Sequence, residues 1–143
     1  MFIETREFGV FFNLVCVNNV KVLQEDGSTF AACVNAASLA LVDAGVGLKD
    51  IVCTCTAADL GLASGDGSVA IIDTNRLEQR CKMMVTCTCL PKSGKIVHVE
   101  STGRVHSDRL PAVLEAAKKG CRELQSVLEN AVREHVSRSL VLA

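Results

Sequence analysis

The feature that most constrains the fold is an apolar run that starts at a tight turn and ends at a glycine. The turn lies at Asp26–Gly27, and Gly45 follows the run. Residues 30–44 include six alanines and only three polar residues, which are Asn35, Ser38 and Asp43. This pattern predicts a helix that Ser28 or Thr29 caps and that Gly45 terminates. Such a thin apolar helix is expected to be buried on nearly all sides, between two layers.

The start of this predicted helix has two interpretations. Free N–H groups and the positive end of the helix dipole favour an anion above the turn, commonly a phosphate. A helix with so few polar residues is also typical of plain core, which is the more common case. The burial expectation ranks three substitutions: Ala36→Asp and Ala40→Asp should destabilise more than Asn35→Asp, because Asn35 lies on the polar stripe.

Composition limits the class of protein. The 143 residues suit one domain, and 49% apolar with 22% charged residues indicates a globular chain. With 3% aromatics and neither Trp nor Tyr, the chain does not fit a protein that reads single-stranded nucleic acid by base stacking. A net charge of −1 gives no overall basic field, so contact with RNA must be local or shared with partner chains. The apolar run at 10–17 is too short to cross a membrane as a helix.

The rest of the chain alternates between strand signals and ends in a helix signal. Residues with strong β-propensity predict five strands, at 17–23, 50–56, 69–73, 82–90 and 95–100. The linker at 91–94 has the composition of a hairpin turn. From Ser107 onward the apolar residues repeat with a period near 3.6, which predicts a long amphipathic helix across the sheet. The fold class is therefore α+β, a mixed β-sheet with packed helices in two layers.

Eight cysteines raise the question of a metal site. Cys53 and Cys55 share one face of a predicted strand, and Cys87 and Cys89 share one face of another. If these strands are neighbours, four thiols converge, which is one way to build a zinc site. The spacing lacks a CxxC pair and no His lies nearby, so buried, reduced cysteines in the core are the preferred interpretation. We therefore expect no metal, no cofactor and a reducing compartment.

Beyond these patterns, the first predicted helix and its flanks resemble the RNase PH family, specifically its exosome-ring branch. That family carries "LQ-x-DGGT" followed by "AACxNAASLALxDAGxxxxDxV" on the same strand, turn and helix. The matching residues here are Leu23-Gln24, Asp26-Gly27, Thr29, Ala31 to Ala40 and Asp43 to Val52. Three later segments agree in order, which are Ile71-Ile72-Asp73 with Leu77-Glu78, Leu90 to Ile96, and the last helix with Gly120-Cys121.

The resemblance implies a place within the family. Residues 72–78 are similar to the "LDPTxxEE" of the mRNA-transport-regulator-three type, whereas the hairpin and first helix resemble a close ring relative at least as well. The match covers about 17–139, so 1–16 is expected to be an unmatched segment and 17–143 the C-terminal portion of an RNase PH-like domain. The implied fold is an RNase PH-like (ribosomal protein S5 domain 2-like) half-domain.

The family's chemistry is only partly matched. In active relatives an Arg follows the Gly-Thr of the turn and binds phosphate with its planar guanidinium group, and here that position is Phe30. Asp73 matches the first acidic residue of the family, whereas the second falls on the uncharged Gln79. Asp73, Glu78 and Gln79 are therefore vestigial candidates, and the resemblance implies no catalytic residue. The plainer interpretation of Asp73 and Glu78 is a strand-end acid and a solvated charge.

Residues that could touch RNA or phosphate form a weak set. It consists of the turn and a small basic cluster, namely Gly27, Ser28, Thr29, Arg76, Arg80 and Lys82. Three solvated surface charges are the more common role for such a cluster. His98, His106 and His135 show neither triad nor ligand spacing and are expected to be ordinary packing or surface residues.

The resemblance implies a non-catalytic subunit of the RNA exosome ring that supports 3′→5′ RNA processing and degradation, rRNA included. The implied partners are other RNase PH-like ring subunits, RNA-binding cap subunits and RNA, with no membrane, in the nucleus, nucleolus and cytoplasm. Two alternatives stay open. One is an active phosphorolytic 3′→5′ exoribonuclease, and the other is a truncated product without independent function. A chain that is half of a family domain is also expected to leave sheet edges and apolar faces that make it self-associate.

Overall fold

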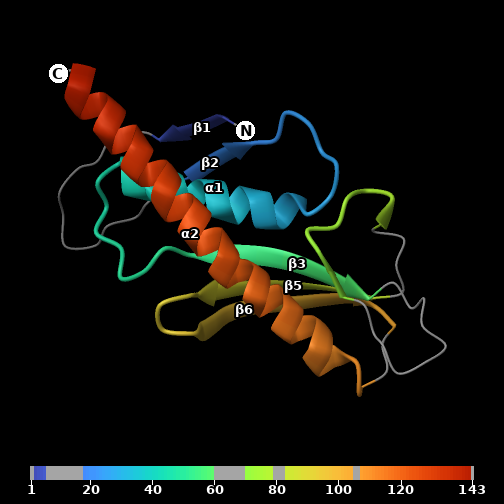
Figure 1. Cartoon of the computed structure of the whole chain (residues 1–143). Helices are drawn as coiled ribbons and strands as arrows, with labels where there is room; N and C mark the ends of the chain where they lie inside the picture. Colours follow the sequence, from blue (N-terminus) through green and yellow to red (C-terminus); the bar gives the residue numbers. More distant parts are fainter. Residues whose placement is uncertain (1, 6–17, 60–69, 79–82, 105–106, 143) are drawn as a thin grey trace.

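A computed structural model describes residues 2–5, 18–59, 70–78, 83–104 and 107–142 (Figure 1). The described residues form two helices and six strands, in the order β1 (Phe2–Thr5), β2 (Asn18–Lys21), α1 (Thr29–Asp43), β3 (Cys53–Asp59), β4 (Ala70–Ile72), β5 (Met83–Leu90), β6 (Lys95–Gly103) and α2 (Leu110–Leu142). Strands β1 and β2 form one pair, and the larger sheet has the order β4-β3-β5-β6. Every pairing among these strands is antiparallel. The α+β class is thus confirmed.

The expected elements are present with shifted bounds. Strand β3 begins three residues later than the predicted start at Asp50. The preceding residues bind side chains instead: Asp50 Oδ1 accepts from its neighbour Ile51, and Ser38 Oγ accepts from Val52 N–H at 3.0 Å. The hairpin turn after β5 ends at Gly94, whose φ of 66° is the left-handed conformation that glycine adopts without strain. Strand β6 continues to Gly103, beyond the predicted end at 100.

The core lies between the sheet and α2. Alternate residues of β3 and β5 face the helix, so the buried cluster contains Cys53, Cys55, Ala57, Val85, Cys87 and Cys89 from the sheet with Val113, Ala117 and Cys121 from α2. Gly120 lets the helix lie close to β3, because a Cβ there would meet the Cys55 Sγ atom and the Ile72 side chain. The expected long helix across the sheet is therefore confirmed (Figure 1).

The opposite face of the same strands carries a ladder of threonines. Thr54 lies opposite Thr88 and Thr56 opposite Thr86, with hydroxyl oxygens 2.9 and 3.2 Å apart. All four side chains are buried. Cross-strand hydroxyl bonds satisfy groups that would otherwise lose their water, which is what permits a polar face to be buried.

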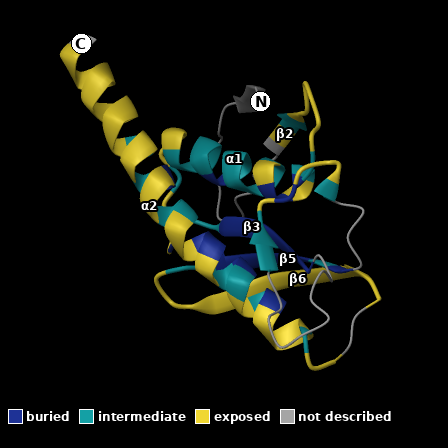
Figure 2. Ribbon diagram, turned by 45° about the vertical axis from the view of Figure 1, so that its right-hand side comes forward, coloured by how far each residue is buried: buried dark blue, intermediate teal, exposed yellow. Residues whose placement is uncertain are grey.

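Helix α1 lies along the edge of β3, and it also contacts α2 and the β1–β2 pair. Its Asn35 side chain accepts from the Thr54 N–H at 2.7 Å and donates to the Thr54 carbonyl at 2.9 Å. Only Ala31 and Ser38 are buried in this helix, and most of its residues are intermediate (Figure 2). The expectation of burial on nearly all sides is wrong, because α1 uses polar side chains to bind the strand edge and most of its other side chains stay partly exposed.

Helix α2 is partly covered by the rest of the described chain as far as Val132. Arg109, just before it, donates to the buried Asp59 carboxylate at 3.0 Å and fixes its start against β3. Residues 133–141 are all exposed, and Figure 1 shows this end extending past the sheet. Neither helix of the described part has the length and apolarity required to span a membrane.

Candidate functional site

The start of α1 is packed against the loop that follows β4. Gly27 has a φ of 109°, and a Cβ there would clash with the Thr74 carbonyl oxygen and the Asn75 backbone. Ser28 is also left-handed, with a φ of 48°, and its Oγ donates to the Thr74 carbonyl at 3.0 Å. The turn therefore requires a glycine for two reasons, its backbone conformation and this close approach.

The expected side-chain cap is not formed. Ser28 occupies the capping position, but its hydroxyl is used by Thr74, and no side-chain cap bond is made. The Thr29 Oγ1 is buried and has no hydrogen-bond partner among the described residues. Ser28 is the N-cap residue, as predicted, but the side-chain cap bond is missing because the tertiary contact with Thr74 takes the Ser28 hydroxyl. At the other end, Gly45 has a φ of 71° and terminates the helix as predicted.

A pocket of about 180 Å³ lies beside this helix start, where the resemblance places phosphate. Phe30 is 49% exposed, and its ring lies 5.6 Å from the His98 ring. The pocket is lined by Glu25, Ser28, Thr29, Phe30, Thr56, Met84, Thr86, Glu100 and Thr102. Two carboxylates and an aromatic ring thus stand near the helix dipole, and no described lining residue is basic. This surface does not favour an anion.

The loop at 73–78 holds two of the candidate acids in different roles. Asp73 is exposed with a φ of 60°, and its N–H donates to the Thr56 carbonyl at 2.8 Å, continuing the ladder of β3. Glu78 accepts from the Asn75 N–H at 2.9 Å, while Asn75 Oδ1 accepts from the N–H groups of Leu77 and Glu78. This reciprocal pair closes the loop as a capping box closes a helix start.

A second pocket, of about 550 Å³, lies on the α2 side of the helix start. Asp73 and Glu123 line it together with Asn35, Cys55 and Gly120. Its described lining is acidic or neutral. Of the weak RNA-contact set, Arg76 is exposed on the loop, whereas Arg80, Lys82 and the candidate Gln79 lie outside the described residues. The structure therefore joins Gly27, Ser28 and Asp73 in one place but leaves the basic cluster untested.

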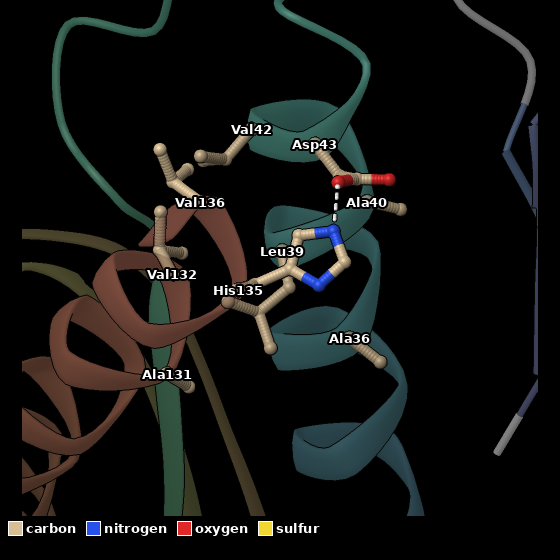
Figure 3. Close-up of a pocket in the computed structure, with 9 residues that line it drawn as sticks. All are labelled: Ala36, Leu39, Ala40, Val42, Asp43, Ala131, Val132, His135 and Val136. Atoms are coloured by element: carbon tan, nitrogen blue, oxygen red, sulfur yellow. Dashed lines mark ion pairs between the residues drawn. The ribbon is translucent and has the colours of Figure 1, made fainter. Parts of the chain in front are cut away.

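A third pocket, of about 430 Å³, is the groove between α1 and the second half of α2. Figure 3 shows Leu39 and Val42 of α1 facing Val132 and Val136 of α2 across it. At its rim His135 Nε2 lies 3.1 Å from Asp43 Oδ1, and both side chains are about two-thirds exposed. A pair this exposed contributes little stability. His135 is thus a surface residue, as expected.

The cysteines form part of the core. Cys53 lies opposite Cys89 and Cys55 opposite Cys87, so the two strands are neighbours as the metal-site alternative requires. Burial raises the pKa of Cys53 and of Cys55 to about 11, and that of Cys87 to about 12. With pKa values this high, the thiols stay protonated at neutral pH and are poor nucleophiles. The interpretation of these cysteines as small buried hydrophobes is confirmed.

Sequence reasoning missed the edge-covering role of α1. Asn35 was expected to lie on a polar stripe that tolerates a charge, but Asn35 and Ser38 both bind the backbone around β3. Their spacing of three residues on an otherwise apolar helix is the signal, since residues so spaced share one helix face. Asp50 was not singled out either, although its Oδ2 accepts from the Lys92 N–H at 2.9 Å and ties this edge to the hairpin.

Comparison with known proteins identifies similar sequences and folds. Residues 13–47 match the model of the 3′ exoribonuclease family, domain 1 (RNase PH). The chain is 43% identical over 124 residues to exosome complex component RRP41 of Bos taurus and 41% identical over 124 residues to that of Homo sapiens, and both matches cover 86% of this chain. The chain spans 48% of each of these relatives, about half of their length. Rice (Oryza sativa) Rrp46 superimposes with a TM-score of 0.67 at 21% identity, covering 78% of this chain and 51% of that one.

These comparisons bear on the resemblance seen in the sequence. The similarity to RRP41 agrees with an exosome-ring relative, while the mRNA-transport-regulator-three type is not confirmed. Because the rice protein has low sequence identity to this chain, its structure supports the fold only. Together, the matches in sequence and in fold support an RNase PH-like chain related to exosome components.

Proposed function

We propose that this chain acts as a non-catalytic subunit of an RNA exosome ring, where it contributes structure and part of an RNA path. In this role it supports 3′→5′ processing and degradation of RNA, rRNA included. The proposal rests on the similarity to RRP41-type components, extended to the part of those proteins that this chain spans. We place it with other RNase PH-like subunits, RNA-binding cap subunits and RNA, in the nucleus, nucleolus and cytoplasm.

The observation that carries the non-catalytic role is the pocket at the start of α1. Phosphorolysis requires inorganic phosphate, a dianion that needs cationic or N–H donors around it. Here Phe30 stands where the resembling family has Arg, and Glu25 and Glu100 line the same pocket. The two carboxylates repel a phosphate, and no described lining residue is a cation that would offset this repulsion.

The loop beyond β4 supports the same role. Glu78 is engaged by the Asn75 N–H, so its carboxylate serves loop geometry. Asp73 keeps the position of the first family acid, but the second position of that motif is the uncharged Gln79. A structural subunit needs the shape of this loop rather than its acid chemistry.

Incubation with a labelled single-stranded RNA and inorganic phosphate tests the proposal. We expect no release of nucleoside diphosphates from the purified chain, with an active RNase PH as the positive control. Phosphate-dependent shortening that disappears in Asp73→Asn would instead establish the alternative, an active phosphorolytic exoribonuclease. Glu123→Gln, which changes the other acidic residue of the neighbouring pocket, is the matched control.

The assembly role is tested in cells. A tagged chain is expected to recover RNase PH-like ring subunits and RNA-binding cap proteins, identified by mass spectrometry, and to localise to the nucleus, nucleolus and cytoplasm. We expect a loss of recovery in Leu140→Glu, because Leu140 is 74% exposed on the uncovered end of α2. Ser139→Glu is the matched control on the adjacent exposed position. A wild-type chain that recovers none of these proteins would leave a domain without this role.

A further inference from the structure

Strand β6 is an edge strand with an open outer side. Its inner side pairs with β5, and it ends the order β4-β3-β5-β6. All nine residues of β6 are exposed, because α2 lies over β3, β4 and β5 (Figure 2). Three of them are large and apolar: Ile96, Val97 and Val99 are 42%, 59% and 43% exposed. An edge of this length and apolarity is a template for pairing with another strand.

A bulge changes which residues of β6 share a face. Lys95 lies opposite Leu90 and Glu100 opposite Thr86, with the register shift between Thr88 and Cys89. Leu90 and Thr86 are four residues apart on β5 and so point to one face, which places Lys95 and Glu100 on that face as well. In a regular strand these two residues, five positions apart, would point to opposite faces.

The apolar residues are aligned by the same bulge. Ile96 lies opposite Cys89 and Val99 opposite Cys87, so both belong to the face that carries α2. Val97 is the extra residue between them. The pattern around the middle of β6 is therefore symmetric. A charged residue and an apolar residue, Lys95 and Ile96, precede the bulge, and an apolar residue and a residue of opposite charge, Val99 and Glu100, follow it.

We propose that a second copy of this chain pairs antiparallel with β6, about a two-fold axis perpendicular to the sheet. In this register Lys95 lies opposite Glu100 of the second copy, Ile96 opposite Val99, and Val97 opposite His98. Two ion pairs form on one face and two apolar pairs on the other, and the two four-stranded sheets become continuous. This goes beyond the proposed ring function, since it is a contact between identical chains.

Charge complementarity is what selects a second copy as the occupant. Among the described residues neither Lys95 nor Glu100 has an ion-pair partner, although Lys92 pairs with Glu129 nearby. Lysines and bulges on an edge normally discourage pairing. Here the bulge aligns Lys95 of each strand with Glu100 of the other. The lysine that would repel most strands therefore attracts a second copy of this strand. A shift by one residue would set opposite faces against each other, which fixes the register.

Charge reversal tests this pairing in the full-length chain by analytical ultracentrifugation and light scattering. Lys95→Glu places two glutamates on each strand, and Glu100→Lys places two lysines. Each single variant is expected to raise the dimer dissociation constant about tenfold or more, since each puts two repulsive pairs into the two-fold contact. The double variant Lys95→Glu/Glu100→Lys restores the pairs in exchanged order and is expected to dimerise like the wild type.

A mixture gives the sharpest result. Equal amounts of Lys95→Glu and Glu100→Lys are expected to form a mixed dimer, because each glutamate of one chain then faces a lysine of the other. The control is the same exchange at Lys119 and Glu123, an exposed pair on α2 at 3.9 Å, which should leave dimerisation unchanged. A monomeric wild type, single variants that dimerise like the wild type, or a mixture that stays monomeric would each overturn the proposal. Circular dichroism of each variant verifies that it is folded.

Discussion

The backbone groups at the two edges of the four-stranded sheet are paired in different ways. Beyond β3, the side chains of Asn35 and Ser38 and the N–H of Asp73 bind the backbone groups that β4 leaves unpaired. Beyond β6, all nine residues are exposed. A helix can thus close a strand edge with two polar residues, whereas an edge without such a helix stays available to another chain.

The difference follows from the free-energy cost of leaving backbone N–H and C=O groups unpaired at each edge. Thr54 is fully buried, so its N–H and carbonyl depend on the Asn35 side chain for their hydrogen bonds on this side. The backbone of β6 keeps access to water, which satisfies its N–H and C=O groups. A partner strand can replace the water bound to the β6 backbone, whereas it cannot replace the side chains of α1 at the β3 edge.

The largest expected effect comes from breaking the covered edge. Asn35→Leu leaves both the N–H and the carbonyl of Thr54 unpaired, and we expect it to lower the free energy of unfolding by about 2–4 kcal/mol. Chemical denaturation measures this. Val97→Thr on the open edge is the control and should change stability by no more than about 0.5 kcal/mol. Equal losses for both would show that the two edges do not differ.

The same comparison reverses the ranking of charge substitutions that the sequence suggests. Asn35→Asp removes the donor to the Thr54 carbonyl, whereas Ala40→Asp points into the open groove between the helices. Asn35→Asp is therefore expected to destabilise more. A greater loss for Ala40→Asp would restore the interpretation of α1 as a fully buried helix.

A smaller effect is expected from the close approach of α2 to the covered side. Gly120→Val puts new atoms against the Cys55 and Ile72 side chains, and overpacking of this kind costs about 1–3 kcal/mol. The control is Gly47→Val, where a Cβ meets nothing within 4 Å. Thermal unfolding of both variants distinguishes them. A tolerated Gly120→Val would mean that α2 lies farther from β3.

The smallest effect is a pH dependence that belongs to the covered core. Burial raises the pKa values of the Cys53 and Cys55 thiols to about 11, from an ordinary value of 9.0. Between these values the unfolded chain releases thiol protons that the folded chain keeps, so stability is full below pH 9 and falls as pH rises toward 11. Denaturation midpoints at several alkaline pH values should show this fall. Cys55→Ala should make it shallower, and an unchanged slope would contradict the burial of Cys55.

Much of the fold was predictable from periodicity. The hairpin between β5 and β6 was marked by Pro91 to Gly94, and the long stripe after Ser107 predicted α2 because a helix buries one face at a period of 3.6 residues. The face shared by Cys53 and Cys55 followed from strand alternation, although only the sheet order shows that Cys87 and Cys89 lie beside them.

The candidate site was less predictable, because its side chains find partners far along the chain. Ser28 was expected to cap its own helix but binds Thr74, which lies 46 residues away. Glu78 was a vestigial catalytic candidate, or else a solvated charge, but it binds Asn75 within its own loop. Local propensity assigns a polar side chain to the nearest free group, and it contains no information on groups that tertiary packing brings closer.

The sequence by itself determined the order of elements from β2 onward, the glycine at each tight turn and the resemblance of its first helix to one family, but it did not predict β1. These depend on local backbone preference and on side-chain periodicity, which are properties of neighbouring residues. Only the tertiary structure decided that α1 covers an edge and that a bulge places Lys95 and Glu100 on one face of β6. Both results depend on strand register, which is set by the packing of all strands together and not by any one segment.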